Sequence, residues 1–508
     1  MKKYYLTLLL ATSLFSSNAQ SLYEPAVFTD AQRLEKIRQT LPAVEKLVEE
    51  EFKKNTFPGL TYGIVVDGQL IHTKSLGYTN LARKTPASEK SLFRIASMSK
   101  SVTAMAILKL RDEGKLRLDD PVQQYIPELR KTPALTVDAP LITIRHLLTH
   151  AAGFPEDNPW GDRQLAISDM NFLKMLNKGV SLSNPPGIAY EYSNMGFAML
   201  GRIITVVTKM PYQTYIDQNI FKPLGMTQTF WEYAKAPADL LAHGYRWENE
   251  KWSEEKLLHD GAYGAMGGLI TSIEDFSKYM AFHQAAWPPR SEAGSGPISR
   301  SSVREMHQPA NFASLVTNTK ADGKPYSIAT AYAYGLRWTK DSDDIMTVGH
   351  SGGLPGFGSN WRILPEYGIG VVSYMNLTYA NANALNTKII DLLRVQADFH
   401  KRQLPVSKVL AQRKEEIIKV LRDWNRANQY PIFAENFFPD HSQAIRKKAS
   451  DELFARIGKI VKVGELVPEN QLRGAFIMEG EKGKVQVYFT LSPEKPALIQ
   501  QLDLREIQ

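Results

Sequence analysis

A serine and a lysine stand three positions apart in the segment FRIASMSKSVTAMAILKL, which runs from Phe93 to Leu110. In a helix, positions i and i+3 lie on one face, so the Lys100 amine can approach the Ser97 hydroxyl. Serine becomes a strong nucleophile only when a neighbouring base takes its proton. The pair therefore indicates nucleophilic catalysis with a lysine as a candidate base.

Lysine acts as a base only when it is neutral, and the surroundings of Lys100 favour that form. The apolar neighbours Val102, Met105 and Ile107 disfavour the ammonium by desolvation. The positive end of the helix dipole also disfavours a cation, whereas it favours an oxyanion at the start of the helix. The same few residues thus suit both proton removal and transition-state stabilisation.

Two later segments carry side chains that complete such a site. Residues Tyr192–Asn194 follow the loop Pro185–Gly187 and precede a helical apolar pattern that begins at about Met195. Their side chains are placed where they can reach a cleft. Residues His350–Gly353 follow the apolar stretch Ile345–Val348, which predicts a strand ending in small residues. A substrate can approach the backbone closely there.

In this order, the three elements resemble the serine β-lactamase and penicillin-binding-protein superfamily. They are most similar to the branch that holds class C β-lactamases, D-alanyl-D-alanine carboxypeptidases, D-aminopeptidases and related esterases. The motifs Ser-x-x-Lys, Tyr-x-Asn and Lys/His-x-Gly of that branch correspond here to Ser97 and Lys100, Tyr192 and Asn194, and His350 and Gly352. The flanking stretches LLTHAAGFP, IFKPLGM and MGGLITSIEDFSKYM are also similar, and the resemblance runs from about Thr56 to about His400.

The resemblance implies a role for each motif residue. Ser97 attacks an acyl carbonyl and forms an ester that water or another nucleophile resolves. Lys100 and Tyr192 share the proton transfers, and the sequence leaves open which of them is the general base. The backbone N–H groups of Ser97 and Gly353 form the oxyanion hole. The substrate and the oxyanion are expected to lie against Asn194, His350, Ser351, Gly352 and Gly353.

Histidine at position 350 is a departure from class C β-lactamases, which carry a lysine there. A largely neutral histidine can donate a hydrogen bond without a full charge. This disfavours an efficient β-lactamase and favours a peptidase, amidase or esterase. We therefore expect a serine hydrolase that acts on small esters or amides, D-amino-acid peptides of the cell wall among them. The N-terminal segment described below adds the expectation that it is exported. Two alternatives stay open: a penicillin-binding or sensing protein that acylates without efficient turnover, and a true class C-like β-lactamase. The complete set Ser97, Lys100, Tyr192 and Asn194 favours an enzyme.

A rival nucleophile is Ser351, because Gly349–Gly353 spells G-x-S-x-G, the nucleophile elbow of α/β-hydrolases. That motif requires a helix directly after the serine. The sequence GGLPGFGSN follows instead, and its glycines and proline disfavour a helix. We therefore favour Ser97 over Ser351.

A zinc site is suggested by His146 and His150, which stand at i and i+4. No glutamate follows His146, and the sequence offers no third ligand at metal-site spacing. We expect His150 to end a helix before Gly153 and to hydrogen-bond locally. The sequence also contains no phosphate loop and no dinucleotide fingerprint, so we expect neither a metal nor a cofactor.

The segment Met1–Ala19 is typical of a secretory signal, with Lys2 and Lys3 before an apolar run that ends at about Phe15. The chain contains no cysteine. We expect a periplasmic or secreted bacterial protein without a membrane span after signal cleavage. Its expected partner is a small molecule or short peptide rather than a nucleic acid, and the sequence does not indicate an oligomeric state.

The fold class expected is α/β, in the two-part plan of β-lactamase-like proteins: an antiparallel sheet flanked by helices, plus a helical region. Alternating residues surround an Asp67-Gly68 turn and predict a hairpin. Further strands are predicted at Tyr332–Trp338 and from Gly358, and a helix from about Ala382 to His400. The early hairpin and the late strands are expected to join in one sheet.

A domain boundary is predicted near Pro405, which gives a hydrolase domain at 20–403 and a C-terminal domain at 404–508. Helical patterns followed by strand-like runs predict a small α+β domain, similar to cystatin-like or nuclear-transport-factor-like appendages. Between Lys401 and Lys462 there are fourteen Lys and Arg against seven Asp and Glu. This charge indicates solvated helix faces or, as the alternative, weak contact with an anionic cell-surface polymer.

Overall fold

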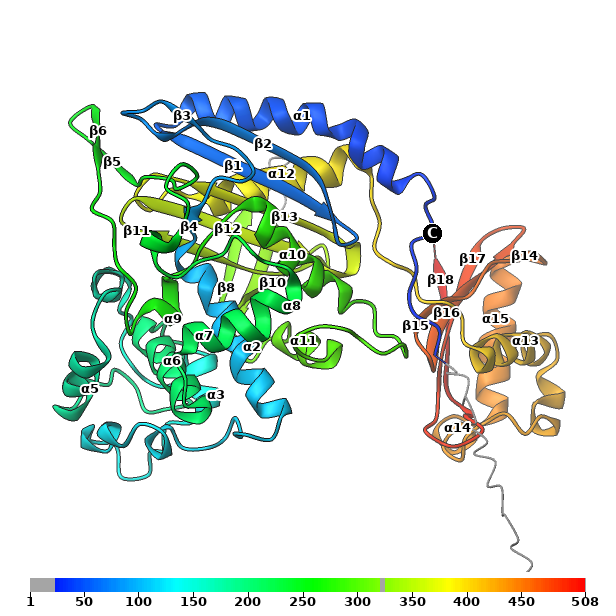
Figure 1. Ribbon diagram of the computed structural model, residues 1–508. Coiled ribbons are helices and arrows are strands. Elements are labelled where there is room, and N and C mark those ends of the chain that lie inside the picture. Colours follow the sequence, from blue (N-terminus) through cyan, green and yellow to red (C-terminus); the bar gives the residue numbers. More distant parts are fainter. Residues whose placement is uncertain (1–22, 320–324, 508) are drawn as a thin grey trace, which may run out of the picture. The chain divides into compact units, whose positions relative to one another are not determined.

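The computed structural model describes residues 23–319 and 325–507, so the predicted signal Met1–Ala19 lies outside the described residues. The chain divides into two compact units (Figure 1). The larger unit comprises Phe28–Pro289 and Ala293–Arg402, and the smaller unit is built mainly from Gln403 onward. Among the described residues, no helix is long and apolar enough to cross a membrane.

Nine of the described strands of the larger unit form one antiparallel sheet in the order β3-β2-β1-β13-β12-β11-β10-β9-β8. Leu60 of β1 pairs with Met375 of β13, so the N-terminal hairpin joins the late strands as predicted. The strands are β1 (Gly59–Val66), β2 (Gln69–Asn80), β3 (Thr85–Pro86), β8 (Asn311–Thr319), β9 (Pro325–Tyr332), β10 (Arg337–Asp341), β11 (Met346–Leu354), β12 (Phe357–Leu364) and β13 (Ile369–Met375).

Two turns of this sheet show how far the sequence pattern predicted its strands. The β1-β2 hairpin turns at Asp67 and Gly68, whose φ angles of 49° and 79° are those that tight hairpin turns require. The strand predicted at Tyr332–Trp338 is wrong, because β9 ends at Tyr332 and β10 begins at Arg337. Between them the chain turns at Gly335, with φ +67°.

Helices cover both faces of the sheet. Helices α1 (Arg33–Lys54) and α12 (Ala382–Ala397) lie along one face (Figure 1). Their apolar side chains share a core with the sheet that includes Ile37, Val44, Ile389 and Val371. Helix α10 (Ile273–Ala285) packs on the other face, against β1, β2 and β13. Strand β1 is therefore buried at every position.

The helical region predicted between the early hairpin and the late strands is present. It is built around α2 (Ser99–Asp112), which is buried over nearly its whole length and packs against α6 (Asn194–Thr208). The other helices of this unit are α3 (Ile144–Leu148), α4 (Asn158–Gly161), α5 (Asp169–Asn177), α7 (Tyr212–Ile216), α8 (Lys222–Leu224), α9 (Gly264–Gly267) and α11 (Arg300–Met306). Short strands pair as β4 (Phe93–Arg94) with β7 (Ile270–Thr271) and as β5 (Tyr245–Glu248) with β6 (Lys251–Glu254).

The smaller unit has helices first and an antiparallel sheet after them, as predicted for an α+β C-terminal domain. Its own apolar core includes Leu410, Ile417, Phe476 and Val487. Strand β15 pairs with β16, and the other strands run in the order β14-β16-β17-β18. The elements are α13 (Lys408–Arg422), α14 (Phe437–Asp440), α15 (Gln443–Ile457), β14 (Ile460–Val463), β15 (Val467–Asn470), β16 (Arg473–Gly480), β17 (Lys484–Leu491) and β18 (Ile499–Ile507). The likeness to cystatin-like or nuclear-transport-factor-like appendages stays a prediction.

Candidate active site

Ser97 lies in a single 3₁₀ turn, η1 (Ala96–Met98), that leads directly into helix α2. Ala96 has a φ of +51°, a left-handed conformation that is unfavourable for residues other than glycine and is often found at functional sites. Ser97 is 7% exposed and lines the cavity described below. Lys100 lies one turn further on and is fully buried.

Three oxygen atoms lie within hydrogen-bond distance of the Lys100 amine, and the Met266 sulfur lies 3.8 Å from it. Lys100 Nζ lies 3.0 Å from Ser97 Oγ, 2.7 Å from Asn194 Oδ1 and 3.0 Å from the Met266 carbonyl oxygen. The amide and carbonyl oxygens can only accept hydrogen bonds. A neutral amine has two N–H groups and one lone pair, so its hydrogens go to Asn194 and Met266. The lone pair then faces the Ser97 hydroxyl, which is the arrangement that a general base requires.

The electrostatic surroundings shift the proton affinities of Lys100 and Tyr192 in opposite directions. Burial lowers the pKa of Lys100, and the positive charge of Arg337 lowers it further, although Asp162 and Asp157 act against this shift. Burial raises the pKa of Tyr192, and a hydrogen bond with Ser97 acts against that shift. Lys100 is thus the group more ready to be neutral, and Tyr192 keeps its proton. These shifts favour Lys100 as the base and Tyr192 as a proton donor.

Tyr192 is positioned by aromatic packing. Its ring centre lies 4.9 Å from Lys100 Nζ and 4.3 Å from the ring centre of His150. His150 in turn lies 4.2 Å from the ring of Tyr332. The phenol is therefore held in a buried cluster of tilted aromatic rings beside the Ser-Lys pair.

Asn194 is the first residue of helix α6, and Asp157 fixes that helix end. The Asp157 carboxylate accepts hydrogen bonds from the backbone N–H groups of Asn194, at 2.6 Å, and Met195, at 2.9 Å. The Asn194 amide nitrogen donates to Asn158 Oδ1 at 3.1 Å, while its oxygen holds Lys100. Asn194 is fully buried and does not line the cavity described below. The predicted contact with a substrate carbonyl stays a prediction.

The third motif lies on strand β11. A side chain at Gly352 would place its Cβ 2.2 Å from the Ile95 carbonyl oxygen, so only glycine fits there. The strand consequently lies directly against the segment that carries Ser97, which agrees with the predicted oxyanion hole of Ser97 and Gly353. Ser351 lies inside this strand, and a hairpin leads to β12 rather than to a helix. The nucleophile-elbow interpretation therefore lacks its structural context.

His350 is bonded within the protein through both ring nitrogens. Its Nδ1 lies 2.5 Å from the Ser351 carbonyl oxygen, which can only accept, so Nδ1 carries the hydrogen. The Nε2 atom, 2.9 Å from the Tyr332 hydroxyl, then accepts. Burial holds the pKa of His350 well below its usual value, and the charges of Lys100 and Arg337 lower it further. His350 thus lines the site as a neutral ring with neither nitrogen free.

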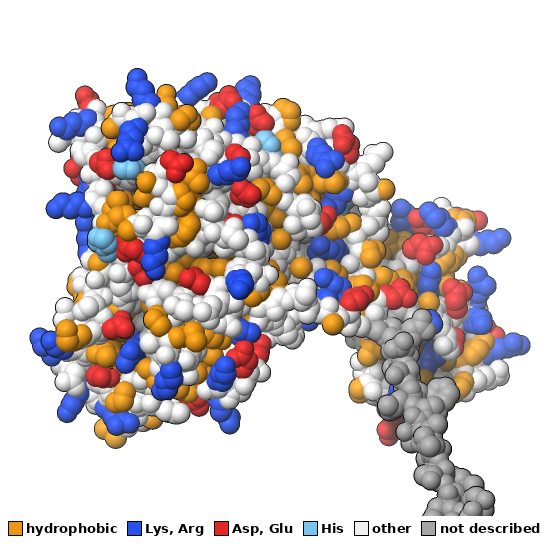
Figure 2. Space-filling view, in the orientation of Figure 1, with side chains coloured by type: hydrophobic (Ala, Val, Ile, Leu, Met, Phe, Trp, Pro, Cys, Tyr) orange, Lys and Arg blue, Asp and Glu red, His pale blue; other side chains and the backbone are white. Residues whose placement is uncertain are grey.

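The predicted residues come together around a cavity of about 380 Å³. Six of the eight line it, and the two that do not, Lys100 and Asn194, lie fully buried beside them. The lining residues are Ser97, Asn158, Asp162, Tyr192, Arg337, His350, Ser351, Gly352, Gly353, Ser359, Tyr379, Ala380, Asn381, Ala382 and Asn383. On the face shown in Figure 2, acidic and basic side chains of the larger unit are interspersed.

Sequence reasoning missed seven polar side chains of this cavity, and three of them, Asp162, Arg337 and Tyr379, are titratable. Arg337 begins strand β10 and pairs with Gly349, next to His350. Its guanidinium carbon lies 5.8 Å from the ring centre of Tyr192. No carboxylate in the described part of the chain lies within ion-pair distance of it. The position of Arg337 on the strand that precedes the His350 strand could have indicated its role. The sequence pattern, however, joined that strand and the turn at Gly335 into one predicted strand.

The two histidines of the zinc hypothesis use ring nitrogens for backbone contacts. His146 Nδ1 accepts from the Thr143 N–H at 3.2 Å, and His150 Nδ1 accepts from the Ser193 N–H at 3.1 Å. His150 follows the end of helix α3, as predicted, but its partner comes from a distant loop rather than from its own turn.

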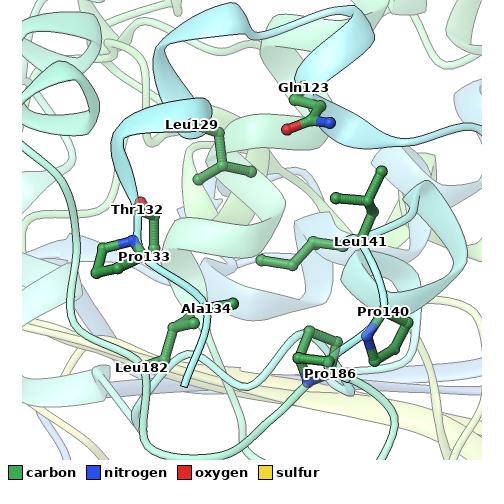
Figure 3. A pocket seen from close by; sticks show the side chains of 11 residues that line it. Gln123, Leu129, Thr132, Pro133, Ala134, Pro140, Leu141, Leu182 and Pro186 are labelled. Atoms are coloured by element: carbon green, nitrogen blue, oxygen red, sulfur yellow. The ribbon is translucent and has the colours of Figure 1, made fainter. Parts of the chain in front are cut away.

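A separate small cavity of about 70 Å³ lies on the helical region, between Leu129, Leu141, Leu182 and Pro186 (Figure 3). Its lining contains no titratable side chain.

The fold and the buried Ser-Lys pair define the class as a β-lactamase-like serine hydrolase. The Beta-lactamase family model matches residues 44–395, and the chain belongs to this family. Sequence relatives include protein flp of Staphylococcus aureus strain N315, 31% identical over 383 residues, covering 74% of this chain and 71% of that protein. Beta-lactamase-like protein 4 of Dictyostelium discoideum is 25% identical over 366 residues, covering 69% of this chain and 62% of its own.

Solved structures share the fold. The octameric penicillin-binding protein homologue from Pyrococcus abyssi has a TM-score of 0.57 at 21% identity, covering 92% of this chain and 98% of its own. The D-alanine carboxypeptidase AmpC from Burkholderia cenocepacia has a TM-score of 0.55 at 18% identity, covering 70% of this chain and 99% of its own. These likenesses establish the β-lactamase-like architecture of the larger unit.

Proposed function

We propose that this protein is an exported enzyme that cleaves small esters or amides through an acyl-enzyme on Ser97. The observation that carries the proposal is the environment of Lys100: a buried amine, 3.0 Å from Ser97 Oγ, whose other two oxygen neighbours can only accept hydrogen bonds. Burying a lysine is unfavourable even when its amine has hydrogen-bond partners, so stability alone does not explain this alignment. It is what a base for serine requires.

The proposed reaction has two halves. Lys100 takes the Ser97 proton, Oγ attacks the carbonyl carbon, and the backbone N–H groups of Ser97 and Gly353 hold the oxyanion. Tyr192 then gives a proton to the leaving alkoxide or amine and recovers the proton that Lys100 took from Ser97. In the second half, a water molecule gives a proton to Lys100 and attacks the ester carbonyl. The bond to Ser97 Oγ breaks, Oγ takes that proton back, and the free acid leaves.

The substrate is proposed to carry a carboxylate on its leaving-group side. Arg337 presents a cation to the cavity beside Tyr192 and His350, and no described carboxylate neutralises it. An arginine binds a carboxylate through paired N–H groups. Arg337 thus supplies the fixed positive charge that a lysine at position 350 would have given. Short D-amino-acid peptides with a free carboxyl end fit this requirement.

The test compares Ser97→Ala with Ser101→Ala in the mature protein. Ser101 is a buried serine of the same helix that donates to the Met98 carbonyl at 2.9 Å and does not line the cavity. We expect Ser97→Ala to abolish hydrolysis of a p-nitrophenyl ester and labelling by a fluorescent phosphonate, and Ser101→Ala to retain both. Retained activity in Ser97→Ala with loss in Ser351→Ala would refute the proposal. Stoichiometric labelling without turnover on esters, a chromogenic cephalosporin, D-alanyl-D-alanine or D-amino-acid amides would favour the sensor instead.

A further inference from the structure

Asp162 is a nearly buried carboxyl group on the wall of the catalytic cavity. The residue is 3% exposed and lies at the start of a 3₁₀ turn after helix α4. Its Oδ2 accepts one hydrogen bond, from the Tyr379 hydroxyl at 3.1 Å. Within the described ranges, no lysine, arginine or histidine nitrogen lies within 4.0 Å of the carboxylate. The proposed reaction gives this group no task.

The neighbours of Asp162 place it beside the expected position of the acyl group. A Cβ on Gly161, the preceding residue, would lie 2.8 Å from Asn194 Cβ, so this turn packs directly on the Asn194 side chain. Tyr379, which bonds Asp162, lies against the third motif: a Cβ on Gly353 would be 2.9 Å from its ring. Asp162 is thereby linked on one side to the residue that holds Lys100 and on the other to the predicted oxyanion hole.

An unpaired carboxylate in such a place is unfavourable. Burial raises the pKa of Asp162, and the charge of a protonated Lys100 acts against this shift. In the proposed reaction Lys100 is a neutral amine until it takes the Ser97 proton, so this compensation is absent while the substrate binds. A cationic group on the substrate would supply this compensation, because a buried charge is stable only when it is paired with an opposite charge.

We propose that Asp162 binds a free α-ammonium group on the acyl part of the substrate, so that the preferred substrates are aminoacyl esters or amides with an unblocked amino group. This inference rests on the proposed function of Ser97. Arg337 lies by Tyr192 and His350, whereas Asp162 lies by Asn194 and Tyr379. One anion and one cation on the wall of the same cavity match a short zwitterionic peptide, with its ammonium at Asp162 and its carboxylate at Arg337.

The test uses the full chain and two pairs of substrates. The D- and L-alanine p-nitroanilides carry a free amino group, and their N-acetyl derivatives do not. The variant is Asp162→Asn, which keeps an acceptor for Tyr379 and removes the charge. The control is Glu156→Gln, which removes a charge from an exposed residue outside the cavity lining that still influences Asp162 electrostatically.

For the wild type and Glu156→Gln, we expect kcat/KM to be at least about tenfold higher for a free-amino substrate than for its N-acetyl derivative. In Asp162→Asn, kcat/KM for the free-amino substrate should fall until this preference is lost. For the N-acetyl derivative, kcat/KM should stay within about twofold of wild type. Where anilide turnover is too slow, competition by D-alaninamide against ester hydrolysis gives the same comparison, with the N-acetyl amide as the reference.

Three results would overturn the inference. The wild type could show no preference for the free amine, or Asp162→Asn could slow both substrates equally, which would mean that Asp162 acts through Lys100. Asp162→Asn could also accumulate acyl-enzyme with both substrates, which would mean that Asp162 takes part in deacylation. In all three cases Ser97→Ala still abolishes hydrolysis. Failure of the proposed function differs, because Ser97→Ala would then remain active whatever Asp162 does.

Discussion

Replacing Lys100 by methionine isolates its part in proton transfer. Methionine is similar in length and apolar, so it fits the buried position and offers neither base nor charge. The Asn194 and Met266 oxygens lose their partner, at a cost of about 1–3 kcal/mol each, and the removal of a desolvated amine offsets part of this. We therefore expect a folded protein that has lost its base.

The magnitude of the effect follows from general base catalysis. A positioned base contributes about 10² to 10⁴ in rate, which corresponds to roughly 3–5 kcal/mol of activation free energy. We expect Lys100→Met to lower the rate constant for Ser97 acylation by this factor. In the wild type, that rate rises with pH as Lys100 loses its proton. Because burial lowers the pKa of Lys100, the rise should be complete well below the usual lysine pKa of about 10.4.

The assay is the burst of p-nitrophenol from an activated ester, followed by stopped flow between pH 5 and 10. Lys109→Met is the matched control, because Lys109 lies on the same helix and pairs with Glu113 at 3.0 Å, away from the cavity. It should keep the wild-type profile. If Lys100→Met acylates within tenfold of wild type with the same pH dependence, then Lys100 is not the base.

Two further predictions concern packing and acid stability. Gly352→Ala should lower kcat/KM by about a hundredfold, since its Cβ would meet the Ile95 carbonyl at 2.2 Å and displace β11 from Ser97; wild-type kinetics would contradict this. Burial lowers the pKa of His307 to about 3, so the unfolded chain alone takes up this proton as the pH falls below about 6.5. In urea titrations, the free energy of unfolding should drop by about 2 kcal/mol more than in His307→Gln between pH 6.5 and 5; equal slopes would contradict this.

The sequence predicted the residues whose chemistry fixes both their type and their spacing. Ser97 and Lys100 must lie one helical turn apart, and Gly352 must lack a side chain, so each leaves a local pattern. The Asp67-Gly68 hairpin and the helix from Ala382 likewise follow local rules, and both are present.

The residues that sequence reasoning missed reach the site through contacts distant in the chain. Arg337 depends on its register with Gly349 and on the turn at Gly335, where a Cβ would lie 2.6 Å from the Lys100 carbonyl oxygen. That turn is apolar because it packs on helix α2, and its residues therefore resemble a strand. Asp162 stands in a polar segment typical of an exposed loop, and only its packing beside Asn194 and Tyr379 buries it. No local periodicity marks either position.

The most direct test of the central claim is to locate the covalent adduct. The purified protein is treated with a fluorophosphonate, digested, and examined by tandem mass spectrometry alongside Ser97→Ala. We predict one modification, on the peptide that contains Ser97, and none in the variant. An adduct on Ser351, or continued ester hydrolysis by a protein in which Ser97 stays unmodified, would contradict a Ser97 acyl-enzyme.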